Sequence, residues 1–227
     1  MAVSKGNCFI CGKTAGKVAI KNHILKEHDK GSEDCLLMKA EGAYNKDYWL
    51  YFSIPLSASL SALDIFLRGI WCECCDHLSA FQINRNELCE TTRLSDFYID
   101  DVIFYDYDFG STTKIQLTVV DVISRKKKEE IVQLLARNVP VVYGCDECNE
   151  PAIYIDIYNS ASYCEKCAES LEDGDMLMRI TNSPRCGVCG YGGELDIWTF
   201  DPEKPFPQPQ KDGINQKRKL CEGDIYG

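Results

Sequence analysis

Pairs of cysteines separated by two residues are the feature of this sequence that could most directly do chemistry. The chain has 227 residues and 14 cysteines, and five such pairs begin at Cys8, Cys72, Cys145, Cys164 and Cys186. Chance placement of this many cysteines would produce about one such pair. Two intervening residues let one tight turn present both sulfurs to a tetrahedral metal ion. A thiol redox motif would instead be a single pair at the start of a helix. The five repeated pairs therefore predict metal binding.

The first pair belongs to the pattern C-x2-C-x11-H-x4-H, which covers residues 8–28. Residues 17–28 contain no proline or glycine and are predicted to form a helix, which would bring two histidines about one turn apart. This unit resembles a CCHH-type zinc finger, and we assign it to a domain of residues 1–34. Its candidate ligands are Cys8, Cys11, His23 and His28.

Residues 145–167 carry the most specific pattern in the chain, C-x2-C-x15-C-x2-C. Between the two pairs, isoleucines alternate with polar and aromatic residues over 153–158, which predicts a strand. Two such turns joined through β structure predict a zinc ribbon, and four cysteine ligands leave no position for a reactive water. We place this ribbon, with a Cys- and Gly-rich extension, in residues 143–200. Its candidate ligands are Cys145, Cys148, Cys164 and Cys167.

The stretch WCECCDHLSAF, residues 71–81, allows three interpretations. In the first, Cys75 could be a nucleophile with His77 as its base, provided that Asp76, Asp106 or Asp108 orients the histidine. In the second, the cysteines could be small apolar packing residues and His77 a hydrogen-bonded junction residue. The sequence favours this interpretation, because free cysteine is among the most buried residue types. In the third, a third zinc ion could bind here. Its ligands would be drawn from Cys72, Cys74, Cys75, His77, Cys89, Cys186 and Cys189.

Residues 44–140 are predicted to form an α+β domain, a mostly antiparallel sheet with a packed helix. The first strand is predicted over 46–54, with one face formed by Tyr48, Leu50, Phe52 and Ile54. A helix is predicted over 59–71, where Ser61 and Asp64 resemble a capping box and apolar residues recur at helical spacing. Residues 29–43 are predicted to be a linker with a short helical turn. Further strands are predicted at 79–83, 101–107, 113–123 and 131–138.

Composition and charge limit the classes of function. The chain is 45% hydrophobic and 11% aromatic, enough for a substantial core, and its net charge is −10. This charge disfavours binding to bulk nucleic-acid phosphate. Six lysines nevertheless lie in residues 1–30, so any nucleic-acid contact is expected at the N-terminal finger. The tail, residues 201–227, is proline-rich and then basic, and is predicted to be extended.

The N-terminal residues contain no apolar signal-peptide core, and the apolar stretches are too short to span a membrane. We therefore expect a cytoplasmic protein without a membrane partner. Disulfides are rare in the cytoplasm, which again favours metal binding by the cysteines.

An ordered series of short motifs resembles one prokaryotic family. The series is YWLYFSIP, a helix, IW-x-x-C-C-x-HLSAF, a YDFG turn, LLARN, a cysteine ribbon and NSPR-x-GVCGY, over about residues 46–192. It is similar to the cysteine-bearing branch of the Ri-plasmid open-reading-frame-three-like family, found on plasmids and mobile elements. The resemblance implies an α+β core and no known activity. Where that family has a second histidine, this chain has Ser79, so a paired-histidine site is not carried over.

These patterns lead to one expected function and two alternatives. We expect a non-enzymatic, zinc-stabilised interaction or adaptor protein with two structural zinc ions. Its acidic core suits a protein partner, either a basic protein or one that handles nucleic acid. The first alternative is a nucleic-acid-associated accessory factor of mobile-element or phage biology that uses the N-terminal finger. The second is a thiol- or metal-dependent enzyme centred on Cys75 and His77.

Overall fold

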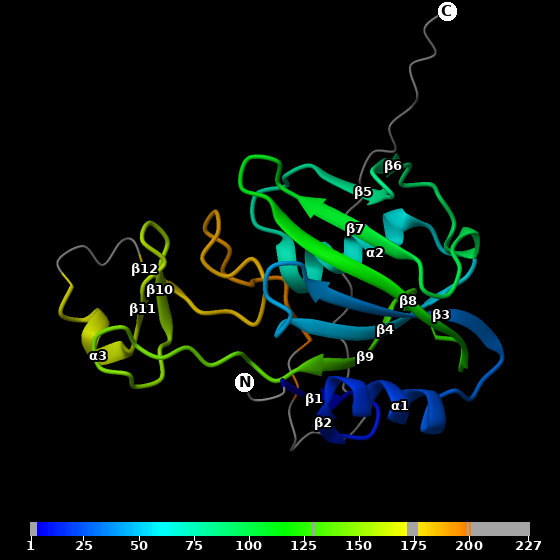
Figure 1. Ribbon diagram of the computed structural model, residues 1–227, viewed down its shortest axis with the longest axis horizontal. Coiled ribbons are helices and arrows are strands. Elements are labelled where there is room, and N and C mark those ends of the chain that lie inside the picture. The colour runs from blue at the N-terminus through cyan, green and yellow to red at the C-terminus, as the bar shows by residue number, and fades with distance from the viewer. Residues whose placement is uncertain (1–3, 129, 172–176, 199, 201–227) are drawn as a thin grey trace, which may run out of the picture.

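The computed structural model describes residues 4–128, 130–171, 177–198 and 200, and its largest element is an antiparallel sheet (Figure 1). Within this part of the chain, nine strands hydrogen-bond in the order β2-β1-β9-β4-β3-β8-β7-β5-β6. The strands are β1 Lys5–Cys8, β2 Thr14–Gly16, β3 Glu33–Gly42, β4 Trp49–Pro55, β5 Ser79–Ile83, β6 Asn86–Leu88, β7 Val102–Tyr107, β8 Thr113–Arg125 and β9 Gln133–Asn138.

Helices cover both faces of this sheet, and a smaller sheet lies beside it (Figure 1). One face is covered by α1 Lys17–Glu27, and the other by α2 Leu60–Leu67, which continues into a π-helical turn, η1 Arg68–Cys72. A 3₁₀ turn, η2 Leu94–Asp96, follows β6. The smaller sheet and its helix consist of β10 Tyr154–Asp156, β11 Ser162–Tyr163, β12 Leu177–Arg179 and α3 Glu165–Ala168.

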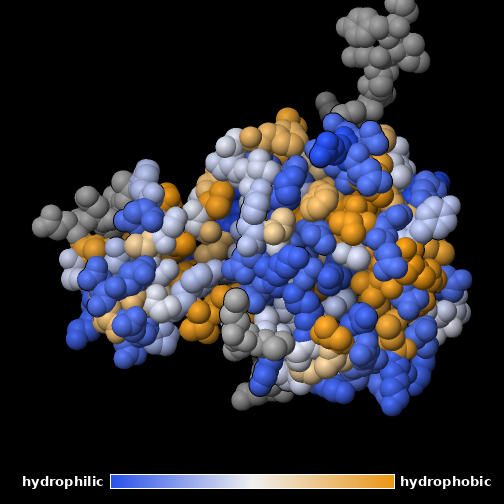
Figure 2. Space-filling view, in the orientation of Figure 1, coloured by the Kyte–Doolittle hydropathy of each residue, from blue (hydrophilic) through white to orange (hydrophobic). Residues whose placement is uncertain are grey.

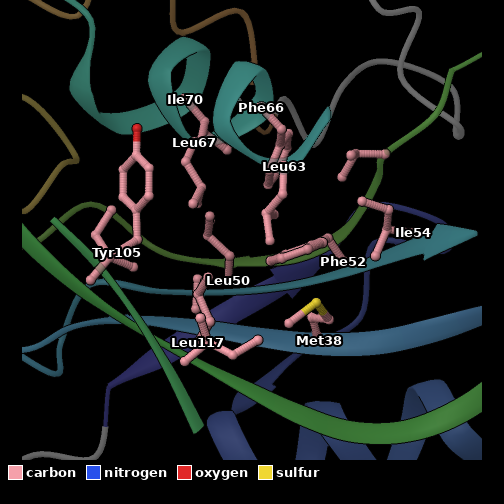
Figure 3. Close-up of a cluster of buried hydrophobic side chains, with 14 of the residues drawn as sticks. Met38, Leu50, Phe52, Ile54, Leu63, Phe66, Leu67, Ile70, Tyr105 and Leu117 are labelled. Carbon is pink, nitrogen blue, oxygen red and sulfur yellow. The ribbon is translucent and has the colours of Figure 1, made fainter. Parts of the chain in front are cut away.

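Strand β4 shows why both faces of the sheet are apolar. Its even-numbered residues Leu50, Phe52 and Ile54 point toward α2, as Figure 3 shows. Its odd-numbered residues Trp49 and Tyr51 belong to a second buried cluster, which α1 covers. Successive side chains of a strand point to opposite faces, so a strand covered on both faces is apolar throughout. The predicted strand and its core face are confirmed.

The helix predicted over 59–71 is confirmed, but its predicted capping box is wrong. All five apolar residues that recur at helical spacing are buried, and Figure 3 shows Leu63, Leu67 and Ile70 above β4. The five are Leu60, Leu63, Leu67, Ile70 and Trp71. The N-cap residue is Ser59, whose side chain makes no capping hydrogen bond. Asp64 is buried and accepts hydrogen bonds from Arg68, Ser79 and Tyr105. Its carboxylate therefore binds an arginine within the core instead of capping the helix.

The linker predicted over 29–43 is wrong over most of its length, because Glu33–Gly42 forms the central strand β3. It pairs with β4 on one side and with β8 on the other. Leu36, Met38 and Ala40 face α2, whereas Cys35 and Leu37 face α1. Since both faces are buried, the sequence lacks the apolar–polar alternation that usually indicates a strand.

The strands predicted at 79–83, 101–107, 113–123 and 131–138 are confirmed within one or two residues at their ends. The described chain is therefore mostly antiparallel sheet with few helices. Strand β1 pairs with β9, so the sheet crosses the predicted boundary between residues 1–34 and 44–140. The predicted tail, residues 201–227, lies outside the described residues. Among the described helices, none is both long and apolar enough to span a bilayer.

Candidate metal centres

The structure brings Cys8, Cys11, His23 and His28 together, as their spacing predicts; we call this set centre 1. Their ligand atoms all lie within 4.8 Å of one another. The two imidazole Nε2 atoms are 3.1 Å apart, Cys11 Sγ is 3.1 Å from His23 Nε2, and Cys8 Sγ is 3.4 Å from His28 Nε2. A tetrahedral zinc ion requires such separations to be about 3.3–3.8 Å. The four atoms are thus arranged almost as one bound ion would hold them.

In centre 1, the pKa shifts favour the metal-binding form of the two histidines and disfavour that of Cys8. Burial lowers the pKa of both His23 and His28, because desolvation disfavours the charged imidazolium. The neutral imidazole that results is the form that binds metal. Burial has the opposite effect on Cys8, raising the pKa of its thiol to about 11. A metal ion would therefore have to displace the proton of Cys8.

Cys145, Cys148, Cys164 and Cys167 form centre 2, again as the spacing predicts. Cys148 Sγ lies 3.7 Å from the sulfurs of both Cys164 and Cys167. Sulfurs bound to one tetrahedral zinc ion would be about 3.8 Å apart. The backbone N–H of Cys164 is the main cause that lowers the pKa of Cys145 to about 6. Centre 2 therefore offers at least one cysteine that ionises readily near neutral pH.

The first pair of each centre lies in the same backbone turn. In centre 1 the N–H of Gly12 donates to the carbonyl of Cys8, and the N–H of Cys8 donates to that of Lys13. In centre 2 Asn149, Cys145 and Glu150 repeat this pattern at the same spacing. Gly12 and Asn149 both have positive φ, +78° and +62°, which glycine and asparagine tolerate best. A glycine or asparagine directly after C-x-x-C is thus a local signal for this turn.

A third set, centre 3, is formed by Cys74, Cys75, His77 and Cys189, whose ligand atoms also lie within 4.8 Å of one another. The first three follow the π-helical turn η1, whereas Cys189 follows β12. His77 Nε2 is 3.2 Å from Cys189 Sγ. The packing interpretation is therefore confirmed for Cys72, which is fully buried, and wrong for Cys75, which is exposed. His77 is hydrogen-bonded through its backbone to Arg68 and Tyr107, as that interpretation expected.

The remaining cysteines of the predicted third set make other contacts. Cys89 is exposed and contacts Thr91 Oγ1 at 3.0 Å. Cys186 accepts a hydrogen bond from the backbone N–H of Thr181 at 3.3 Å. The C-x-x-C spacing of the 72/75 and 186/189 pairs is consequently misleading, since each pair contributes a single residue to centre 3.

Arg185 is the residue beside centre 3 that the sequence analysis missed. Its side chain is fully buried, and its guanidinium donates to Asp108 at 2.7 Å and to Cys74 Sγ at 3.4 Å. The hydrogen bond from Arg185 holds the pKa of Asp108 below its ordinary value. Asp108 Oδ1 in turn lies 3.6 Å from His77 Nδ1. Asp108 was one of the aspartates that the sequence offered as a partner of His77. No local spacing links Arg185 to Asp108 or Cys74, which explains why the sequence alone did not indicate this arginine.

Comparison with known proteins gives limited information about this chain. No protein-family model and no curated protein matches it. Among solved structures, it is similar to a protein of unknown function from Methanosarcina mazei Go1, with a TM-score of 0.41 and 17% sequence identity. That similarity covers 46% of this chain and 69% of the archaeal one. A similarity of this extent identifies neither a family nor a function.

Proposed function

We propose that this chain is a non-enzymatic adaptor protein, stabilised by structural zinc ions, that binds a basic protein partner. The observation that carries the proposal is the composition of centres 1 and 2, in which four cysteine or histidine side chains converge on one point. Cysteine and histidine are the usual ligands of structural zinc. Four protein ligands fill the tetrahedral coordination of zinc and leave no position for water or substrate. Both ions would therefore stabilise the fold and would not take part in catalysis.

The partner surface that we propose is the acidic segment, residues 86–101, which consists of the edge strand β6 and its connection to β7. Four of its acids are exposed, and so are Tyr98 and Ile99, with 77% and 51% of their surfaces accessible. On the side of the molecule where this connection runs, Figure 2 shows hydrophobic and hydrophilic surface intermixed. Aromatic residues are enriched in protein-binding surfaces, and a predominantly acidic surface, here with Arg93 as its basic residue, complements a basic partner. The exposed acids are Glu87, Glu90, Asp96 and Asp100.

The test is affinity capture by the tagged, zinc-loaded full chain from lysate of its native host, with and without nuclease. We expect a basic protein to be captured in both conditions, and less of it as salt concentration rises, because salt screens exposed charges. A variant of the acidic segment should lose the captured protein. That variant is Glu87→Gln, Glu90→Gln and Asp96→Asn.

A matched control removes the same number of exposed acids from the ribbon region. The control should capture as much partner as the wild-type chain, because it leaves the acidic segment intact. Equal capture by the two variants would contradict the proposed surface, and turnover of a substrate that depends on Cys75 and His77 would contradict the proposed function. The control variant is Glu147→Gln, Glu150→Gln and Glu169→Gln.

A second candidate, a nucleic-acid-associated accessory factor, is favoured by the exposed lysines around centre 1. Their arrangement, together with the resemblance to a mobile-element family, supports binding of phosphate by this end of the chain. Fluorescence anisotropy with labelled DNA or RNA tests it: binding should weaken steeply with salt, and each lysine replaced by Gln should reduce the salt slope by about one. Dispersal of the captured partner by nuclease would favour this candidate over the adaptor. The lysines are Lys5, Lys13, Lys26 and Lys30.

A further inference from the structure

Centre 3 differs from the other two centres in how the chain assembles it. Centres 1 and 2 each take their ligands from one short stretch of sequence, whereas His77 and Cys189 are 112 residues apart. Three ligands lie in the turn between η1 and β5, and the fourth lies on the segment after β12. Whether the four residues meet therefore depends on how that segment packs against the sheet domain.

Contacts that need no metal ion hold residues 182–191 against the end of η1. Ser183 Oγ donates to the carbonyl of Trp71 at 2.6 Å, and Trp71 Nε1 donates to the carbonyl of Asn182 at 3.2 Å. Tyr191, which is 1% exposed, donates to the carbonyl of Ile70 at 3.4 Å. Cys189 is thus presented to Cys74, Cys75 and His77 by the packing of its own segment.

Arg185 places a buried positive charge beside Cys74. The fully buried guanidinium of Arg185 donates to Cys74 Sγ at 3.4 Å and stacks over the ring of Tyr107, 4.8 Å from its centroid. The second terminal nitrogen of the same guanidinium donates hydrogen bonds to Thr113 Oγ1 and to the carbonyl of Ser111. Three thiolates around a divalent cation carry one net negative charge, which an adjacent arginine partly neutralises.

The environment of His77 suits a metal ligand as well. Metal-binding histidines usually place a carboxylate near the ring nitrogen that does not bind the ion. Asp108 Oδ1 lies 3.6 Å from His77 Nδ1, while Nε2 faces Cys189. Asp108 is itself fixed, because it accepts hydrogen bonds from the backbone N–H groups of Gly110 and Ser111 and from Arg185.

We propose that Cys74, Cys75, His77 and Cys189 bind a zinc ion as a third metal centre, with Arg185 and Asp108 as positioning residues. Three cysteines and one histidine form a recognised structural zinc set, and thiolates select zinc over harder cations. The ion would join the turn after the π-helical segment to the segment after β12. This inference does not depend on the partner-binding function.

The first test counts metal ions on the purified full chain by mass spectrometry of its metals. We expect about three zinc ions per wild-type chain and about two in Cys189→Ser or His77→Ala. Both variants should stay folded, since the contacts of Ser183, Trp71 and Tyr191 remain. Two matched cysteine controls, Cys89→Ser and Cys186→Ser, should keep about three ions, because neither residue belongs to centre 3.

Two results would overturn the proposal: a wild-type chain with only two ions, or a Cys189→Ser variant that keeps three. Loss of partner capture leaves the ion count unaffected, so failure of the proposed function and failure of this inference are distinguishable. Substitution by cobalt adds a spectroscopic readout. Thiolate-to-cobalt charge-transfer absorption should fall in Cys189→Ser and stay unchanged in Cys89→Ser.

The role of Asp108 as a positioning residue has a separate test. Asp108→Asn should weaken binding of one of the three ions by about 10–100-fold in a chelator competition and leave the other two unchanged. Asp108→Glu, which restores a carboxylate, should recover part of that affinity. Equal weakening of all three ions would indicate a general loss of stability and contradict the positioning role.

Discussion

At the scale of single residues, Asp64 is the centre of a buried hydrogen-bond network in an otherwise apolar core. It is 2% exposed and lies on α2 between the helix and the sheet. Arg68 Nε donates to its carboxylate at 2.8 Å, and the hydroxyls of Tyr105 and Ser79 each donate to it at 2.7 Å. Arg68 itself is buried and continues the network to Glu73. Removal of the aspartate would leave a buried guanidinium without its main counter-charge.

We predict that Asp64→Ala lowers the free energy of unfolding by about 3–5 kcal/mol, the usual cost of breaking a buried ion pair. Urea denaturation of the zinc-loaded chain measures this change. The matched control Asp96→Ala removes an exposed aspartate and should change stability by less than about 0.5 kcal/mol. Similar changes in the two variants would show that the Asp64 network contributes little to the stability of the folded chain.

At the scale of elements, the unit that carries centre 1 is continuous with the large sheet. Strand β1 pairs with β9, and α1 packs through Ile20 and Ile24 onto the face that Trp49 and Tyr51 form. Gly6 lies where β1 packs against Trp49 and the backbone of β9. A Cβ atom at this position would overlap the ring of Trp49 and the carbonyl of Arg137. The glycine is required by space, since no side chain fits between β1 and these atoms.

We therefore predict that Gly6→Ala destabilises the chain by about 1–3 kcal/mol, because overpacking forces β1 away from β9. Amide hydrogen exchange should show faster exchange in β1 and α1 than in the wild-type chain. The control is Gly144→Ala, where the nearest atom to a new Cβ is 3.9 Å away. Unchanged exchange in β1 of Gly6→Ala would refute the tight docking of this unit.

A second contact between elements joins α1 to β3 through Glu41. Lys17 Nζ lies 2.6 Å from Glu41 Oε1, and Lys39 Nζ lies 2.7 Å from Oε2. Burial raises the pKa of Glu41, but the hydrogen bonds and charges of the two lysines more than compensate, so the net pKa is lowered. A carboxyl with a lowered pKa in the folded state stabilises that state above its ordinary pKa, and the effect disappears as pH falls.

We predict that Glu41→Gln lowers the thermal midpoint at neutral pH, and that the difference from the wild type shrinks as pH falls through the lowered pKa of Glu41. Thermal unfolding of both proteins over a pH series measures this difference. Because both chains carry the same metal centres, acid release of metal affects both curves and cancels in the comparison. A difference that stays constant down to acidic pH would contradict the role of the charged carboxylate.

At the scale of the whole molecule, the two sheets have unequal cores. The large sheet buries an extensive apolar cluster that includes Phe52, Leu63 and Trp71. Among the residues that the structure describes, the buried cluster of the smaller sheet consists of Cys145, Tyr163 and Ala168, and Cys145 is a candidate ligand. Small units with so little apolar burial usually need a metal ion or disulfide to fold.

Removal of metal should therefore unfold the two parts of the chain differently. With a strong chelator present, we expect amide protection to disappear over residues 145–168 and to persist in β3, β4 and β8. Hydrogen exchange followed by mass spectrometry provides the measurement, and addition of zinc should restore protection. Simultaneous loss of protection in both sheets, or none in either, would contradict the unequal dependence on metal.

Much of this organisation could be predicted from residues close together in the sequence. The groupings of Cys8, Cys11, His23 and His28, and of the four cysteines of centre 2, follow from spacings that one turn, one hairpin or one helix can bridge. The strand with Leu50, Phe52 and Ile54 follows from its many aromatic residues, which favour strands and which β3 lacks. The helix after it follows from its apolar period. Each of these patterns depends on local backbone geometry, which repeats at a fixed interval whatever the rest of the chain does.

The other assignments could be made only from the tertiary structure. Strand β3 escaped prediction because helices bury both of its faces and so remove its alternation. Cys189 could be assigned to Cys74, Cys75 and His77, and Cys72 to the core, only once residues 182–191 were seen packed on Trp71. Arg185 was missed because it lies in the same segment, far in the sequence from Cys74 and Asp108. Contacts between residues more than 100 positions apart depend on how packed surfaces fit together, and no local period in the sequence records that fit.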